Sequence, residues 1–361
     1  MDKKALKLLH TGNAAAFDNY LRELSREEKD ELLSAIFVHG DSIAHFAARE
    51  HKLEILKVLA KHQCSFEISN DNGQLLQYLP LRRRPLHEAI DSQLCVEFLV
   101  SICKVDINAM KRGDWTALMI AVSFWNKAMK GIDDTVKFLI KAGARVDMIN
   151  RDGWNALHLA VKEGKFLSFA RYTELAKYLV DIHPQATMVI SKSGRLSVQT
   201  AARCNADPSL TLYLLKNSSS PPEAILNHQD NSGQTLLQDA VAAKNIDLVR
   251  VLLEEYKADA NVPDKLGRTA VHHAAMIGSL AILTVFHELH DSQKTVIQWD
   301  IPDSWDQWTP LMHAAREGNM DCAAYLIKCC HCDASKKDKQ GRTAHEIGEL
   351  DRKTWWTDCI F

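Results

Sequence analysis

Apolar residues along this chain form a short phrase that returns many times. In residues 269–274 (Thr-Ala-Val-His-His-Ala), a capping residue is followed by small and apolar residues, a polar residue and a closing alanine. Apolar triplets spaced i, i+3 and i+4 follow these phrases, such as Val249, Leu252 and Leu253. This spacing places three side chains on one face of an α-helix. The pattern therefore predicts a repeated unit made of a turn and two helices.

The phrase recurs at a nearly constant interval. Copies occur at residues 42–47, 84–89, 116–121, 155–160, 196–201, 235–240, 269–274 and 309–314. The closing alanines are 34 residues apart between Ala240 and Ala274, and 32 apart between Ala89 and Ala121. One such unit cannot bury its own apolar face, so neighbouring units must stack. The interval therefore predicts an elongated stack of helical repeats.

Individual positions of the phrase have simple physical roles. The first residue caps the helix that follows by accepting a backbone N–H. Glycines in the preceding turn suit a left-handed backbone; they are Gly153, Gly194, Gly233, Gly267 and Gly341. A histidine recurs in the fourth position and is expected to bond to neighbouring turns rather than to act chemically; these are His45, His87, His158 and His272.

The repeated phrases, such as Arg-Pro-Leu-His-Glu-Ala at 84–89 and Thr-Pro-Leu-Met-His-Ala at 309–314, resemble the ankyrin-repeat family over roughly residues 5–350. The resemblance implies an all-α solenoid of about nine stacked helix-turn-helix units with β-hairpin fingers. We expect N-terminal capping helices at 1–39, repeats at 40–337, and a degenerate C-terminal capping repeat with an apolar tail at 338–361.

The resemblance also implies where a partner binds, because members of this family usually use the concave face. The finger positions there are Trp115, Trp154, Arg195, Gln234, Arg268, Trp308 and Arg342, and the inner-helix positions are Arg49, Lys162, Glu163, Arg316 and Glu317. Tryptophan and arginine are common in binding hot spots. Each tryptophan could instead pack on the adjacent finger. The leading expectation is a non-catalytic adaptor or regulator that binds a folded intracellular protein.

Composition narrows the possible partners. The 46 acidic and 44 basic residues nearly cancel, so no overall field favours nucleic acid or an anionic membrane. No run reaches the roughly 18 apolar residues of a membrane span. Nine cysteines without a secretory leader indicate a protein whose thiols stay reduced. We expect it in the cytoplasm, and secondarily in the nucleus. We expect a monomer that binds a protein and needs no cofactor.

Few residues point to chemistry. The densest group of soft ligands is Cys329-Cys330-His331-Cys332, which gives the alternative of a metal- or redox-responsive regulator. Zinc sites usually use two separated ligand pairs, and no second pair lies nearby, so we expect no metal site. The glycines form neither a phosphate loop nor a dinucleotide fingerprint. No set of acid, base and nucleophile emerges, and no enzyme is expected.

Two consecutive units contain insertions between their helices. The added segments are 123–133 and 165–173, and they contain Phe124, Trp125, Phe166, Phe169 and Tyr172. These aromatic residues either form a binding patch on the edge opposite the fingers or only bury one another. The sequence leaves both readings open.

Overall fold

The computed structural model describes residues 3–37, 41–69, 83–124, 132–163, 169–204 and 207–350. The chain divides into two compact units, residues 1–168 and 169–361. The predicted residues Trp125 and Phe166 and the tail from 351 onward lie outside the described residues. Tyr172 of the second insertion is buried in the core.

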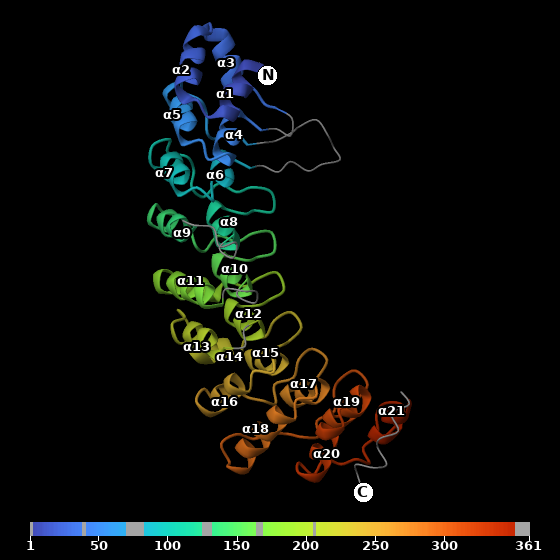
Figure 1. The fold of residues 1–361 in the computed structure, drawn as a ribbon. Helices are drawn as coiled ribbons and strands as arrows, with labels where there is room; N and C mark the ends of the chain where they lie inside the picture. Colours follow the sequence, from blue (N-terminus) through green and yellow to red (C-terminus); the bar gives the residue numbers. More distant parts are fainter. Residues whose placement is uncertain are drawn as a thin grey trace. The chain divides into compact units, whose positions relative to one another are not determined.

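The first unit is built from paired helices. Its elements are α1 (Lys3–Thr11), α2 (Ala14–Glu23), α3 (Arg26–Ser34), α4 (Ile43–Arg49), α5 (Leu53–Lys61), α6 (Pro85–Glu88), α7 (Gln93–Ser101), α8 (Ala117–Phe124), α9 (Ile132–Lys141) and α10 (Ala156–Glu163). The first helices of the pairs, α4, α6, α8 and α10, stack in one file (Figure 1), and α5, α7 and α9 stack in a second.

The second unit continues the same pattern. Its elements are α11 (Phe169–Ile182), η3 (Pro184–Met188), α12 (Ser197–Cys204), α13 (Pro208–Lys216), α14 (Pro222–Leu226), α15 (Leu236–Ala242), α16 (Ile246–Glu254), α17 (Ala270–Met276), α18 (Leu280–Asp291), α19 (Pro310–Glu317), α20 (Met320–Lys328) and α21 (Ala344–Leu350). Here α12, α15, α17, α19 and α21 form the first file, and α11, α13, α16, α18 and α20 form the second. The predicted unit of a turn and two helices is confirmed in both parts.

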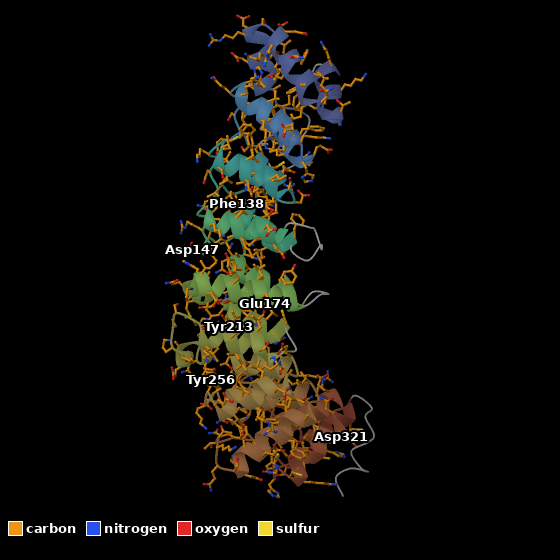
Figure 2. All side chains as sticks on the ribbon, turned by 60° about the vertical axis from the view of Figure 1, so that its left-hand side comes forward. Phe138, Asp147, Glu174, Tyr213, Tyr256 and Asp321 are labelled. Carbon is orange, nitrogen blue, oxygen red and sulfur yellow. The ribbon has the colours of Figure 1, made fainter. Side chains whose placement is uncertain are left out.

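The apolar phrases supply the core between the two files. The triplet Val249, Leu252 and Leu253 of α16 is buried, and so are Ala274 and Ala275 of α17. Small residues on the first helices allow neighbouring backbones to approach closely. Glu174 of α11 and Tyr213 of α13 lie on the outer side of the second file (Figure 2). No helix within the described ranges is long and apolar enough to cross a bilayer.

A tight turn, which we call a finger, precedes most first helices. In the finger 264–268 the N–H of Asp264 donates to the carbonyl of Arg268 at 2.9 Å, and the Asp264 carboxylate accepts two further backbone N–H groups. Equivalent closing bonds span 111–115, 150–154, 191–195, 230–234, 303–308 and 338–342. Within the described residues the pairing amounts to isolated bridges, such as Lys111 with Trp115.

Successive fingers are bonded to one another through their backbones. In the second unit the N–H of Lys265 donates to the carbonyl of Ser232 at 2.9 Å, and the N–H of Ser304 donates to the carbonyl of Leu266 at 2.8 Å. The N–H of Lys339 likewise reaches the carbonyl of Asp306 at 2.9 Å. These bonds hold the finger tips side by side.

The fourth position of the repeated phrase, which we call the histidine slot, can link a first helix to the backbone of the following repeat. His87 and Gln238 show how. His87 Nδ1 accepts the N–H of Arg84 at 2.9 Å, so Nε2 carries the proton and donates to the carbonyl of Ala109 at 2.9 Å. Gln238 makes the same pair of contacts, accepting from Thr235 N–H and donating to the carbonyl of Arg268. In these repeats a neutral imidazole or an amide supplies one acceptor and one donor. Met119 and Met312 occupy the same position in two other repeats.

This slot predicts a pH dependence of stability. Burial lowers the pKa of His87 to about 4 from its ordinary value near 6.5. Its contribution to stability is therefore complete above pH 6.5 and is lost as the pH falls towards 4. When the pH is lowered from 7.5 to 5, we expect the free energy of unfolding of His87→Gln to fall by about 2 kcal/mol less than that of the wild type. Urea unfolding at both pH values measures this, and equal losses in the two proteins would contradict it.

Candidate functional site

The arginines at the predicted finger positions are bonded to buried carboxylates. Arg268 lies 2.8 Å from the Asp264 carboxylate of its own finger, and Arg342 lies 2.6 Å from Asp338 in the same way. Arg195 instead reaches forward, 2.9 Å to Asp230 of the next finger and 2.5 Å to Asp239 of α15. These three side chains are only 20–31% exposed. Much of their bonding capacity is thus committed to the fold.

The carboxylates that hold these arginines have perturbed acidities. Burial opposes the ionisation of Asp264, but hydrogen bonds from His273 and Arg268 outweigh it and hold the pKa of Asp264 below its ordinary value. Asp239 differs, because burial dominates and raises its pKa to about 6 despite Arg195 and Arg203. The carboxylates Asp264 and Asp338 therefore stay ionised beside their arginines at the base of the fingers.

The predicted tryptophans are half-buried, each against a polar neighbour. Lys111 Nζ lies 5.4 Å from the centre of the Trp115 ring, and Lys162 Nζ lies 4.3 Å from that of Trp154. Trp308 donates from Nε1 to Asp338 at 3.1 Å. The Trp154 ring also stacks on His158, and the Trp308 ring meets His313 edge to face. These contacts hold the rings in place.

The remaining predicted positions are divided between bonded and exposed residues. Arg49 forms ion pairs with Asp41 at 2.8 Å and Glu88 at 2.9 Å. Gln234 is half-buried, and Arg316 and Glu317 are exposed on α19. The side chain of Glu163 lies outside the described residues. Arg49, Trp115, Trp154 and Lys162 belong to the first unit; Arg195, Gln234, Arg268, Trp308, Arg316, Glu317 and Arg342 belong to the second.

Two adjoining hollows lie beside the first helices of the first unit. One, of about 310 Å³, is lined by Arg49 of α4, by Glu88 of α6 and by Ile90 and Asp91, which follow α6. The other, of about 200 Å³, lies between the finger 111–115 and helix α8, and Lys111, Trp115 and Phe124 form part of its wall. Arg83 and His87 line both. The structure thus brings the predicted Arg49 and Trp115 to neighbouring depressions.

The sequence analysis missed Trp305, which is 69% exposed. It lies in the finger 303–308, where six positions separate Asp303 from Thr309, whereas five separate Asp264 from Thr269. The bond from Ser304 to Leu266 places this longer finger beside Leu266, which is itself 39% exposed. The distance from Asp303 to Thr309 in the sequence already indicated this extra residue. Leu266 and Trp305 are exposed at the tips of two successive fingers.

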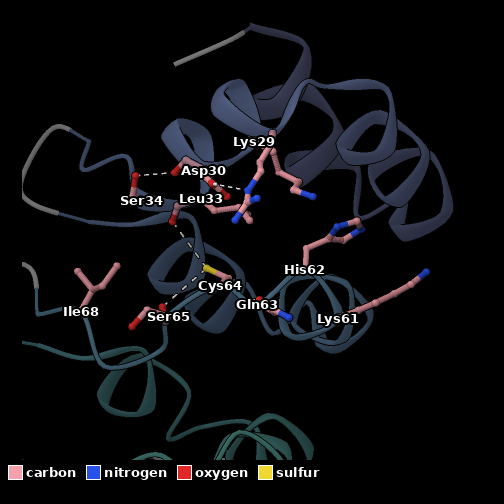
Figure 3. Close-up of a pocket in the computed structure, with 11 residues that line it drawn as sticks. Lys29, Asp30, Leu33, Ser34, Lys61, His62, Gln63, Cys64, Ser65 and Ile68 are labelled. Carbon is pink, nitrogen blue, oxygen red and sulfur yellow. Dashed lines mark hydrogen bonds and ion pairs between the residues drawn. The ribbon is translucent and has the colours of Figure 1, made fainter.

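A wider hollow of about 680 Å³ lies between α3 and the end of α5 (Figure 3). Lys61, in its wall, bonds to Asp18 at 2.8 Å. Cys64 donates to the carbonyl of Leu33, and burial raises the pKa of this thiol to about 12. A thiol held protonated is a poor nucleophile. We assign no function to this hollow.

Burial disfavours the thiolate form of Cys330 and Cys332 in the cluster, and of Cys322, which lies seven residues before it. Burial raises the pKa of Cys322 to about 11 and that of Cys330 to about 12. Cys332 is buried and donates to the carbonyl of Trp299 at 3.8 Å. Across the described part of the chain, no three histidine, cysteine or acidic residues gather in a geometry that could hold a metal ion. These facts do not favour a metal- or redox-responsive role.

Comparison with known proteins places most of the chain in one family. A family model described as "Ankyrin repeats (3 copies)" matches residues 86–190 and 198–298, and another described as "Ankyrin repeat" matches 306–339. The probable 26S proteasome regulatory subunit p28 of Saccharomyces cerevisiae is 30% identical over 127 residues, which cover 35% of this chain and 53% of that protein.

Two further matches contain the same repeats. The nuclear factor NF-kappa-B p105 subunit of Gallus gallus is 32% identical over 145 residues, covering 39% of this chain and 13% of that protein. The solved ankyrin repeat domain of Bcl-3, described as a member of the IkappaB family, has a TM-score of 0.49 at 22% identity and covers 65% of this chain and 95% of that one. The chain spans about half the length of the first curated relative and less of the second.

Proposed function

Because the chain belongs to the ankyrin-repeat family, we propose that it is a non-catalytic protein-interaction module, an adaptor or regulator that binds a folded intracellular protein. The binding surface is the face formed by the fingers and the first helices, the concave face of such repeats. One observation carries the proposal: bonded finger tips present the apolar pair Leu266 and Trp305 to solvent. Exposed aromatic residues on a rigid support are suited to binding hot spots.

The other parts of the proposal concern the organisation of the molecule. We propose about nine repeats with hairpin fingers, capped by residues 1–39 and 338–361, acting as a monomer without a cofactor. We propose that the module acts in the cytoplasm and in the nucleus. The near balance of charge in the whole chain supports a protein partner rather than nucleic acid.

Trp305→Ser tests the binding face. We expect the full-length variant to bind a purified partner, identified by capture from cell extract, about tenfold or more weakly than the wild type, since tryptophan hot spots contribute at least this much. The unfolding midpoint should stay unchanged, because Trp305 is largely exposed. Calorimetry measures the affinity, and urea unfolding measures the stability.

Val296→Ser is the matched control, since Val296 is 70% exposed in the connection before the finger. It should bind like the wild type. Equal affinities for all three proteins would refute a binding role of the finger tips. Alanine at Arg268 is unsuitable for this test, because that side chain holds Asp264 in place.

A further inference from the structure

The smaller hollow of the first unit combines positive charge with aromatic walls. Lys111 and Trp115 enter it from the two ends of one finger, and Phe124 enters from helix α8. Ile120 of α8 adds apolar surface. With a volume of about 200 Å³, the hollow can receive one side chain of a partner but not a folded element.

The ammonium group of Lys111 lies over an aromatic ring. Among the residues that the structure describes, no carboxylate pairs with its ammonium group, whose recorded neighbour is the Trp115 ring. The nearby Glu88 is engaged by other cations: one oxygen accepts from Arg49 at 2.9 Å and the other from Arg83 at 3.1 Å. Asp91, in the adjoining hollow, lies 3.3 Å from His51.

Lys111 also departs from the pattern of the chain's own fingers. In six other fingers the first residue is an Asn, Ser or Asp whose side chain accepts a backbone N–H within the turn. These residues are Asn150, Ser191, Asp230, Asp264, Asp303 and Asp338, whereas Phe37 begins the turn that closes on Asp41. In this finger a cation replaces that acceptor, and the turn still closes through the bond from Lys111 N–H to the carbonyl of Trp115 at 2.9 Å. The lysine side chain is thus not needed to close the turn.

We propose that this hollow binds the carboxylate side chain of a glutamate or aspartate on the protein partner. Lys111 supplies the opposite charge from the finger, and the guanidinium of Arg83 lines the same hollow. The rings of Trp115 and Phe124 pack on the methylene groups of the bound side chain. Desolvated charge pairs of this kind add specificity to recognition. The inference rests on the proposed function and specifies the chemistry of one contact.

Indole ¹H–¹⁵N spectra of the full-length protein test it, with the Trp115 resonance assigned from Trp115→Phe. The probe is acetyl-Ala-Glu-Ala-amide, and acetyl-Ala-Gln-Ala-amide is its neutral counterpart. We expect the glutamate peptide to shift the Trp115 resonance saturably and the glutamine peptide to leave it in place. Lys111→Met should weaken the glutamate peptide about tenfold, since it removes one charge-assisted contact. Lys265→Met, in a finger of the second unit, should change nothing.

Several results would overturn the inference. They are equal shifts with the two peptides, an unchanged affinity in Lys111→Met, or a response to inorganic phosphate without a response to the glutamate peptide. The remaining tryptophan resonances report whether each variant is folded. Partner binding that is lost in Trp305→Ser but retained at full strength in Lys111→Met would reject the carboxylate contact and leave the proposed function intact.

Discussion

The substitution Gly267→Ala is expected to lower the free energy of unfolding by about 3 kcal/mol, because two penalties add. Gly267 has φ +81°, a left-handed conformation that a residue with a Cβ adopts at a cost. A Cβ there would also lie 2.4 Å from the backbone nitrogen of Ser304 in the next finger. Urea unfolding followed by circular dichroism measures the loss.

Gly341→Ala is the matched control for the contact between fingers. Gly341 occupies the same finger position with φ +80°, but a Cβ there would meet no heavy atom of the described residues within 4 Å. We expect it to cost about 1 kcal/mol, the conformational penalty alone. If both variants lose the same stability, the close approach of successive fingers contributes nothing at Gly267.

The substitution Arg195→Ala is expected to cost about 3 kcal/mol, because it strips the closest counter-charge from a buried carboxylate. Asp239 is fully buried, and Arg195 lies 2.5 Å from it, whereas Arg203 lies at 3.5 Å. Asp230 would lose the same partner. Urea unfolding at pH 7 measures the loss.

The pH dependence of that variant gives a second check. The folded-state pKa of Asp239 is raised, to about 6, so protonation favours the folded state as the pH falls from 7 to 5. The loss of Arg195 raises the pKa of Asp239 further. The difference in free energy of unfolding between the wild type and Arg195→Ala should therefore be smaller at pH 5 than at pH 7. Asp239→Asn, which removes the buried charge and leaves Arg195 with Asp230, should change stability by less than about 1 kcal/mol. A deficit as large at pH 5 as at pH 7 would contradict this account.

The repeat architecture was predictable because its cause is local and recurs. Helix caps, apolar spacing and turn glycines each act within one unit. The pattern of one unit is weak, but its repetition along the chain makes it recognisable. The bonding of His87 was predictable for the same reason. The pairing of Arg268 with Asp264 was also predictable, because the two residues lie four positions apart in one finger.

Other features depend on neighbouring units and could not be read from a single repeat. The bond of Arg195 to Asp230 joins different fingers, so it requires the stacking geometry. The exposure of Trp305 follows from one additional finger residue, which mattered only once the finger tips were placed side by side. Lys111 is informative for a different reason, because it breaks the chain's own pattern.

Histidine and glutamine occupy the histidine slot in different repeats, and this has a consequence for the evolution of such a protein. The two side chains make the same two bonds, yet only the imidazole takes up a proton in mildly acidic solution. Acid tolerance can therefore be adjusted one repeat at a time, through a buried residue that links neighbouring repeats. A lineage could move between neutral and acidic surroundings while keeping its recognition surface unaltered.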